Sequence, residues 1–359
     1  MFKVADYLIQ AQAAVAPPHA AELRPLDTRG GGNAGYSFWM LAKAVVSLIR
    51  GRLNGELAGV HVNMAERLSL FRKSVIVVIS RALGVPVVLH LHAAQLHHFY
   101  RNLPRPLQAA TRWVFSLSSS CVVLGENARR FVTDELRVAP DRVEIVINGV
   151  PEPSEPRRLA DPEGVQRVLF VGNLSERKGV SDLLKALALP GFNKSRLDVC
   201  IAGGGELEAY SKKADDLGLD GMVRFAGWSD QQHVALLMAR ADVLVLPSYD
   251  EGLPLVILEA LANGVAVVCS PVGEIPSVLT DGINAIFVVP GDVEGLATAL
   301  QRVLHQPALR RALESNGRAL YEQNFSLTRF FASVAKVHQR HFGIAGQALQ
   351  AGGARQETL

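Results

Sequence analysis

The chain has 359 residues, a length typical of two domains, and its 49% hydrophobic against 20% charged residues exclude an intrinsically disordered protein. Residues 1–149 hold 17 Lys and Arg against 10 Asp and Glu, whereas the remainder holds 20 against 24, so the excess positive charge lies in the first half. A basic half favours an anionic partner, either a phosphate-bearing substrate or an acidic membrane surface, although a merely solvated surface has the same composition. Nothing in the sequence indicates nucleic-acid binding.

No apolar run approaches the roughly 20 residues that a membrane-spanning helix needs. Polar residues interrupt the apolar run at the N-terminus, which is unlike a secretory signal. Cys121, Cys200 and Cys269 each lie in an apolar run without a CxxC pattern, which is typical of buried thiols in a reducing compartment. We therefore expect a cytoplasmic protein, either free or held peripherally on the inner membrane.

The first half opens unusually for an α/β domain. Apolar residues from Phe2 onward recur at helical spacing, where a doubly wound domain has a buried strand and a Gly-rich turn. The first strand is therefore predicted to be missing, and its absence would leave a gap or an exposed sheet edge. Helices are predicted over 37–52 and 66–83. Strands are predicted over 22–27, 58–62, 86–90, 119–125 and 143–148.

The second half repeats a strand-then-helix pattern. Its apolar runs suit parallel strands covered on both faces, so both halves are predicted to be doubly wound α/β domains. A Pro-rich linker over 148–156 divides the chain into domains at 1–150 and 151–326. Ser326 is predicted to cap a last helix over 327–341 that can pack back on the first domain, ahead of a disordered tail over 344–359. Strands are predicted over 167–172, 197–202, 222–227, 242–247, 265–270 and 285–289.

Two carboxylates, Glu251 and Glu259, stand eight residues apart around a turn that opens a helix. Free N–H groups at a helix N-terminus attract an anion, and a carboxylate further along can accept hydrogen bonds from sugar or ribose hydroxyls. An amphipathic helix with a capping Glu would have the same pattern. The turn itself consists of Gly252, Leu253 and Pro254.

A second polar segment follows the strand predicted over 167–172. It begins with Gly172 and Asn173 and then carries Arg177 and Lys178 at the start of a helix. Cations at this position are what a diphosphate leaving group requires, since they stabilise the charge that develops as the bond to it breaks. A solvated surface pair is the alternative interpretation.

The segment PSYDEGLPLVILEALANGVAVV resembles the E-x7-E signature of glycosyltransferase family 4, a family of retaining enzymes with the GT-B fold. VGNLSERKGVSDLL resembles the phosphate-binding segment of that family, and PVGEIP resembles the loop after its next strand. The resemblance covers most of residues 167–304. It implies two doubly wound Rossmann-like domains whose parallel sheets face a cleft, with the donor on the C-terminal domain and the acceptor on the N-terminal domain.

The same resemblance assigns roles to residues. It implies that Glu259 binds the donor ribose, that Glu251 faces the transferred hexose, and that Arg177 and Lys178 stabilise the diphosphate. The family often has Arg where this chain has Asn173. A front-face mechanism with net retention is the expectation, in which the departing diphosphate helps to take the acceptor proton.

In the first half, His90 and His92 end a predicted strand and alternate on one face. His92 matches a family histidine in the active cleft, with Ala93 in place of the following Gly, so it is a candidate catalytic residue. The pair could also suggest a metal site, but no third ligand and no Asp-x-Asp are present. We therefore expect no metal and no cofactor, with the nucleotide sugar as a substrate.

Acceptor contacts are predicted in three segments of the first half. A glycine-rich loop lets the backbone approach a ligand closely, and basic residues on a helix can hold a phosphate. Solvated loops and helix faces explain the same residues equally well. The predicted acceptor-binding residues are Gly31, Gly32, Arg72, Lys73, His97 and Tyr100.

The runs HLHAAQLHHFY and SLFRKS are similar to bacterial exopolysaccharide mannosyltransferases, which implies GDP-mannose as donor and a lipid-diphosphate-linked saccharide as acceptor. Three alternatives stay open: a transferase that uses a UDP-sugar, a sugar-nucleotide epimerase of the same fold, and an inactive homologue truncated at the N-terminus.

Overall fold

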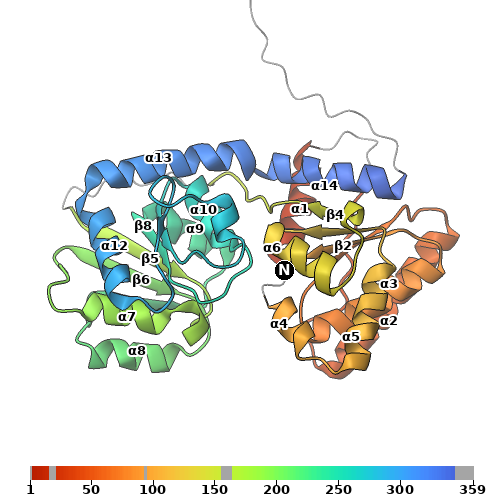
Figure 1. The fold of residues 1–359 in the computed structure, drawn as a ribbon, viewed down its shortest axis with the longest axis horizontal. Coiled ribbons are helices and arrows are strands. Elements are labelled where there is room, and N and C mark those ends of the chain that lie inside the picture. Colours follow the sequence, from red (N-terminus) through yellow and green to blue (C-terminus); the bar gives the residue numbers. More distant parts are fainter. Residues whose placement is uncertain (1, 16–21, 93–94, 155–163, 344–359) are drawn as a thin grey trace, which may run out of the picture.

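The computed structural model describes residues 2–15, 22–92, 95–154 and 164–343. It contains two α/β domains side by side, each built on a parallel sheet, as predicted (Figure 1). The tail predicted over 344–359 and Ala93 lie outside the described residues. In the part of the chain that is described, no helix is both long and apolar enough to cross a membrane.

The N-terminal sheet has four parallel strands in the order β1-β2-β3-β4. Helices α2, α3 and α5 cover the face on which the β2 residues Val87, Leu89 and Leu91 point. The strands are β1 (Val60–Met64), β2 (Val87–Leu91), β3 (Ser120–Val123) and β4 (Val143–Ile145). The helices of this domain are α1 (Phe2–Val15), α2 (Ala34–Leu53), α3 (Leu68–Ala82), α4 (Leu96–Arg101), α5 (Arg105–Ser116) and α6 (Glu126–Arg130), which continues as a π-helix over Phe131–Glu135, with a 3-10 turn over Pro140–Arg142.

Helices from opposite ends of the chain cover the other face of this sheet. Helix α14 (Leu327–Phe342) leaves the C-terminal domain and lies along the N-terminal one, beside α1 (Figure 1). Val88 of β2 and Val122 of β3 pack there against Leu8 and Phe330. Ser326 caps α14 by accepting a hydrogen bond from the backbone of Arg329, as predicted. Helix α1 is therefore wedged between this sheet and the C-terminal domain.

The C-terminal sheet has six parallel strands in the order β10-β9-β8-β5-β6-β7, so the chain reverses direction across the sheet between β5 and β8. The strands are β5 (Gln166–Val171), β6 (Leu197–Ala202), β7 (Val223–Gly227), β8 (Val243–Leu246), β9 (Ala266–Cys269) and β10 (Ile286–Phe287). The helices are α7 (Val180–Ala188), α8 (Leu207–Asp216), α9 (Gln231–Arg240), α10 (Leu255–Ala262), α11 (Ile275–Val278), α12 (Val293–His305) and α13 (Pro307–Asn324), with a 3-10 turn over Glu176–Lys178.

The strand predicted over 22–27 is wrong. Those residues run without secondary structure along a cavity of about 1760 Å³ that β1 also lines, and they pair with no described strand. The predicted gap is thus present at the β1 edge of the sheet, and the N-terminal strands that are described run in chain order without a reversal. The other predicted strands and the buried cysteines are confirmed.

Candidate functional site

The reversal between β5 and β8 is the place where open α/β sheets bind ligands, because the two flanking loops diverge there. The loop after β5 carries Lys178, and the loop after β8 carries Glu251. The Lys178 ammonium donates a hydrogen bond to Oε1 of Glu251 at 2.5 Å, and Glu251 is buried. The two segments singled out from the sequence therefore meet at one point.

Arg177 joins the same group. Its guanidinium donates to the backbone oxygen of Asp250 at 2.5 Å and lies 4.0 Å from Oε2 of Glu251. The backbone of Tyr249 donates in turn to the carbonyl of Arg177 at 2.8 Å. Two cations thus surround one buried carboxylate, in an arrangement whose positive charge would remain available to an anionic ligand.

Two glycines make this close approach of loops possible. Gly179 has φ +69°, and a Cβ there would stand 2.1 Å from the backbone oxygen of Pro247. Gly273, in the PVGEIP loop, has φ +61°, and its Cβ would stand 2.0 Å from the backbone oxygen of Glu251. Side chains at either position would separate the loops that carry the candidate donor residues.

The remaining predicted donor residues flank this group. Gly172 directly follows β5 and its amide donates to the backbone oxygen of Ala202, and Asn173 is exposed beside it. Gly252 and Pro254 form the turn into α10, whereas the Leu253 side chain is buried in the C-terminal core. A ligand at this turn can therefore reach the backbone of Leu253 but not its side chain.

Glu259 lies on α10 at the boundary between the domains, and its contacts come from the N-terminal helix. Lys3 approaches its Oε1 at 2.5 Å, and the Tyr7 hydroxyl donates to the same oxygen at 3.0 Å. Tyr7 is 1% exposed and packs within the core of the C-terminal domain. Burial, followed by the neighbouring Glu259 carboxylate, raises the pKa of the Tyr7 hydroxyl. The sequence did not predict either residue, because nothing local connects α1 with α10.

His92 follows β2 and lies in a row of imidazoles. Its Nε2 is 2.8 Å from Oδ1 of Asn63, and its ring is 4.0 Å from that of His90. His90 lies 3.1 Å from His61, which lies 2.7 Å from His338 of α14. Burial and the neighbouring imidazoles lower the pKa of His61, His90 and His92 well below the usual range, so the row is neutral near pH 7. Because Asn63 accepts through Oδ1, Nε2 of His92 carries the proton, and the buried Nδ1 has a lone pair without a hydrogen-bond partner among the described residues.

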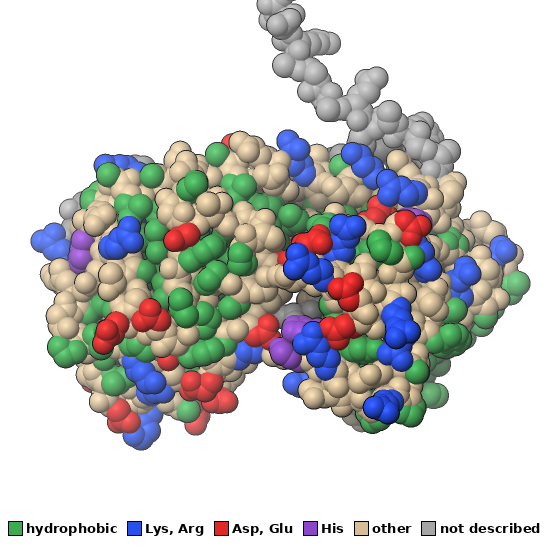
Figure 2. All heavy atoms as spheres, viewed as in Figure 1, with side chains coloured by type: hydrophobic (Ala, Val, Ile, Leu, Met, Phe, Trp, Pro, Cys, Tyr) green, Lys and Arg blue, Asp and Glu red, His purple; other side chains and the backbone are tan. Residues whose placement is uncertain are grey.

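The segment after His92 reaches the donor loop. Gln95 donates to the Asp250 carboxylate at 3.1 Å, which joins the start of α4 to the residue next to Glu251. His97 lies on the first turn of α4, where burial, followed by the adjacent His98, lowers its pKa. Figure 2 shows the surface hollowed between the two domains. The structure thus places the start of α4, three residues after His92, beside the loop that carries Glu251.

Tyr100 does not join this group. Its ring is buried in the N-terminal core, and its hydroxyl accepts from Arg112 at 2.7 Å and donates to the backbone of Glu135 at 3.3 Å. It lies on the side of α4 that faces the N-terminal core, together with Leu96 one turn earlier. The predicted acceptor role of Tyr100 therefore has no support in its position.

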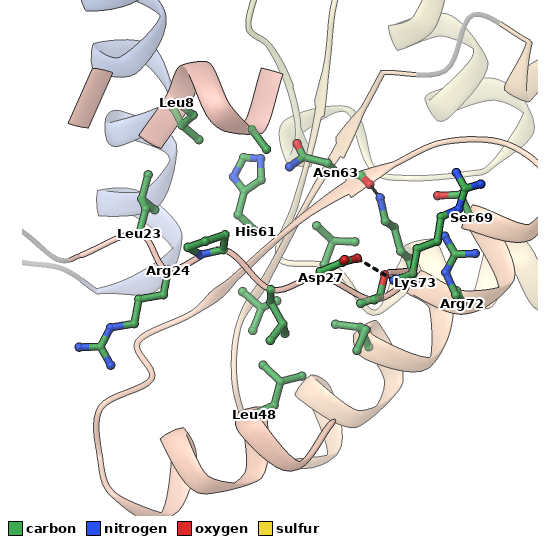
Figure 3. A pocket seen from close by; sticks show the side chains of 18 of the residues that line it. Leu8, Leu23, Arg24, Asp27, Leu48, His61, Asn63, Ser69, Arg72 and Lys73 are labelled. Carbon is green, nitrogen blue, oxygen red and sulfur yellow. Dashed lines mark hydrogen bonds between the residues drawn. The ribbon is translucent and has the colours of Figure 1, made fainter. Parts of the chain in front are cut away.

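Arg72 and Lys73 lie elsewhere, at one end of the cavity beside β1, together with Ser69 (Figure 3). Lys73 donates to the backbone oxygen of Asn63, and burial, followed by the charge of Arg72, lowers its pKa to about 8. Among the described residues, Ser69 Oγ and Arg72 Nε are buried without a hydrogen-bond partner. Gly32 also lines this cavity, whereas Gly31 faces open space. Leu8 and Leu23 line the opposite end.

One contact across the domains was not predicted. The Glu274 carboxylate of the PVGEIP loop accepts hydrogen bonds from the backbone amides of Ala128 at 2.7 Å and Asn127 at 3.4 Å, at the start of α6. Asn127 donates back to the carbonyl of Gly273 at 2.8 Å. The helix start that Glu274 caps thus belongs to the other domain. No group of three metal-ligating side chains occurs within the described residues.

Comparisons with known proteins find relatives of the part of the chain that carries these loops. Residues 152–320 match the family model "Glycosyl transferases group 1". Glycogen synthase of Mycobacterium tuberculosis is 28% identical over 71% of this chain and 63% of its own length. D-inositol 3-phosphate glycosyltransferase of Frankia alni is 32% identical over 57% of this chain and 56% of its own. The lipopolysaccharide core biosynthesis glycosyltransferase LpsE of Rhizobium meliloti is 36% identical over 47% and 48%.

The chain therefore spans less than two thirds of the length of these relatives. Solved structures agree over more of it. Sucrose-phosphate synthase from Thermosynechococcus elongatus superposes with a TM-score of 0.73 at 19% identity, covering 93% of this chain and 91% of that one. Anabaena HepE in complex with UDP gives 0.68 at 18% identity, over 84% and 82%. Two parallel-sheet domains and these structural neighbours establish the GT-B fold, and residues 152–320 are similar to the group 1 glycosyl transferases.

Proposed function

We propose that this chain is a retaining, metal-independent glycosyltransferase that moves a hexose from a nucleotide sugar to an acceptor. The observation that carries the proposal is the meeting of Lys178 and Arg177 with Glu251 at the reversal of the C-terminal sheet. Cations at this position suit a leaving diphosphate, and a carboxylate beside them suits the hydroxyls of the transferred sugar.

In this proposal each donor residue has one task. Lys178 and Arg177 hold the diphosphate and stabilise its charge as the bond from the anomeric carbon to the phosphate oxygen breaks. Glu259 binds the ribose, and Glu251 orients the hexose. The acceptor oxygen bonds to the anomeric carbon on the same face, and its proton passes to the departing diphosphate. Nδ1 of His92 accepts a hydrogen bond from a hydroxyl of the sugar or the acceptor.

We propose a lipid-diphosphate-linked saccharide as acceptor. Ser69, Arg72 and Lys73 support this assignment, since two buried polar atoms without partners stand beside a cation at the end of a largely apolar cavity. Helix α2 supports it further, because it carries three cations and no acidic residue. The exposed apolar side chains of α2 are Tyr36, Phe38, Trp39, Val46, Ile49 and Leu53. Such a surface suits an anionic membrane.

For the donor we propose GDP-mannose, and for the setting exopolysaccharide synthesis at the inner face of the cytoplasmic membrane. The test offers GDP-mannose, UDP-glucose and UDP-N-acetylglucosamine, each with a lipid-diphosphate-linked disaccharide and without an acceptor. Transfer from GDP-mannose to the lipid-linked acceptor is expected. Transfer from a UDP-sugar alone would overturn the donor assignment, and conversion of the nucleotide sugar without an acceptor would indicate an epimerase. Absence of both reactions would contradict the enzymatic assignment.

A further inference from the structure

Helix α1 contacts both domains through different faces. Val4, Leu8 and Ala11 pack on the N-terminal sheet together with α14. Tyr7, on the other face of the helix, is buried in the core of the C-terminal domain. Lys3, one turn earlier, points in the same direction as Tyr7, since residues four apart share a helix face. The helix begins between the two domains (Figure 1). It thus brings an ammonium and a hydroxyl to Glu259 from outside the nucleotide-binding domain.

The side-chain contacts of Glu259 occupy only one of its two carboxylate oxygens. Lys3 and Tyr7 both bond to Oε1, and a carboxylate oxygen has two lone-pair sites. A ribose presents two neighbouring hydroxyls, which a carboxylate binds best with one oxygen each. In the free protein, therefore, a ribose must compete for Oε1 with a charged partner.

We propose that Lys3 and Tyr7 form a latch on Glu259, and that a bound ribose displaces Lys3 from Oε1 while Tyr7 stays and orients the carboxylate. The proposal rests on the assignment of Glu259 to the donor ribose. Lys3 is the partner that leaves, because its side chain is 31% exposed and sits on the first helical turn. Tyr7 is the partner that stays, because its ring is buried and its hydroxyl also accepts from Gln231 of α9 at 3.3 Å.

If the latch exists, Lys3 lowers the affinity for the donor. The size of this effect depends on whether the nucleotide carries the two ribose hydroxyls. Lys3→Met removes the competing charge, so a nucleotide with both ribose hydroxyls gains affinity. A nucleotide without them never competed for Oε1 and gains nothing. A general change in packing or domain orientation would shift both affinities equally.

The experiment measures, by titration calorimetry on the full chain, the dissociation constants of GDP, UDP and their 2′,3′-dideoxy forms. Lys3→Met is expected to bind the better ribonucleotide about threefold to tenfold more tightly, with less than a twofold change for its dideoxy form. Tyr7→Phe keeps the buried ring and is expected to reduce the preference for ribose over dideoxyribose. The matched control is Lys212→Met, which removes a lysine from an exposed ion pair with Asp216 on α8.

The possible outcomes distinguish a failure of the proposed function from a failure of the latch. If neither nucleotide binds the wild type or any variant, the proposed function is wrong, and the latch falls with it. If a nucleotide binds but Lys3→Met leaves the preference for ribose unchanged, only the latch is wrong. A weaker affinity for the ribonucleotide in Lys3→Met would also overturn the latch, since it would mean that Lys3 holds the donor directly.

Discussion

The Glu274 carboxylate and the backbone amide of Ala128 join the two domains at 2.7 Å, so a side chain after β9 caps a helix that begins after β3. Gly125, just before that helix, makes room for the contact, because a Cβ there would stand 2.2 Å from Oε2 of Glu274. Gly125 and Glu274 are therefore in direct contact although they are far apart in the sequence, and substitutions at the two positions should be coupled.

Gly125→Ala is expected to destabilise the protein by about 1 to 2 kcal/mol, since the new methyl group pushes Glu274 from the amides that it caps. Glu274→Ala is expected to cost a similar amount through the lost cap. The loss of stability in the double variant is expected to be smaller than the sum of the losses in the two single variants, because the new methyl group no longer meets the Glu274 carboxylate. Denaturant unfolding of all four proteins measures this coupling. Strict additivity would show that the contact does not govern stability.

Lys178→Met is expected to lower kcat by about 100-fold to 1000-fold, because the leaving diphosphate loses a preorganised donor in the transition state. The same change leaves Glu251 with Arg177 alone at 4.0 Å. Steady-state kinetics with the nucleotide sugar that proves to be the donor measure the effect. Lys194→Met, on an exposed loop, is the control that should retain activity. A rise in KM with unchanged kcat would contradict a role in leaving-group stabilisation.

The sequence indicated features that depend on residues close together in the chain, and it missed contacts between residues far apart in the chain. Both candidate donor segments could be recognised in the sequence because each is local: a strand, a glycine turn and charged side chains stand within ten residues. Their meeting was predictable as well, since the carboxyl ends of β5 and β8 lie at one edge of the sheet. The resemblance to a known family added the roles of Glu251 and Glu259.

The misses have several physical causes. Lys3, Tyr7 and Glu274 act across the domain boundary, and no periodicity in the sequence records which helix packs against which domain. Tyr100 was predicted at the acceptor site, but its side chain packs in the N-terminal core with that of Leu96, one turn earlier on α4. The segment 22–27 has strand-like composition, but a strand also needs backbone hydrogen bonds to a neighbour, and these residues lie along the cavity without pairing with β1.

Acid is expected to destabilise the protein through the imidazole row. Burial holds the pKa of His338 at about 4, below its usual value near 6.5, so the folded protein keeps this group neutral while the unfolded chain protonates it. The contribution of this neutral imidazole to the free energy of unfolding is therefore fully present above pH 6.5. It is lost as the pH drops toward 4, which lowers the free energy of unfolding by about 3 kcal/mol for His338 alone. His61 and His90, whose pKa values are also lowered, add to the loss in the same direction.

Thermal unfolding between pH 7.5 and 4 measures this dependence. His338→Gln keeps a polar partner for His61 but does not titrate, so its stability should fall less steeply with acid than that of the wild type. His233→Gln, on the exposed side of α9, should leave the slope unchanged. Equal slopes for His338→Gln and the wild type would show that the row does not set the acid sensitivity.

The apolar face of α2 is expected to bind anionic lipid. Trp39→Ser combined with Leu53→Ser should weaken association with vesicles of anionic phospholipid by about tenfold or more, because both side chains are exposed and would bury apolar area in the interface. Trp228→Ser removes a tryptophan of the C-terminal domain that is more exposed than Trp39, 78% against 55%, and serves as the control. Co-sedimentation at several salt concentrations measures both the apolar and the electrostatic contribution to vesicle binding. A larger loss in Trp228→Ser would place the membrane-binding surface on the other domain.

Asn63 is expected to set the protonation state of His92. With Oδ1 of Asn63 2.8 Å from Nε2, the imidazole donates there and keeps Nδ1 as an acceptor. Asn63→Asp places a carboxylate at the same distance, which favours the imidazolium and raises the pKa of His92. The imidazolium has no lone pair at Nδ1, so activity on the acid side is expected to fall at a pH about one unit or more higher than in the wild type. The pH profile of kcat/KM measures the shift, with Asn102→Asp on the exposed end of α4 as the control. An unchanged acid limb in Asn63→Asp would show that the neutral form of His92 does not limit the reaction.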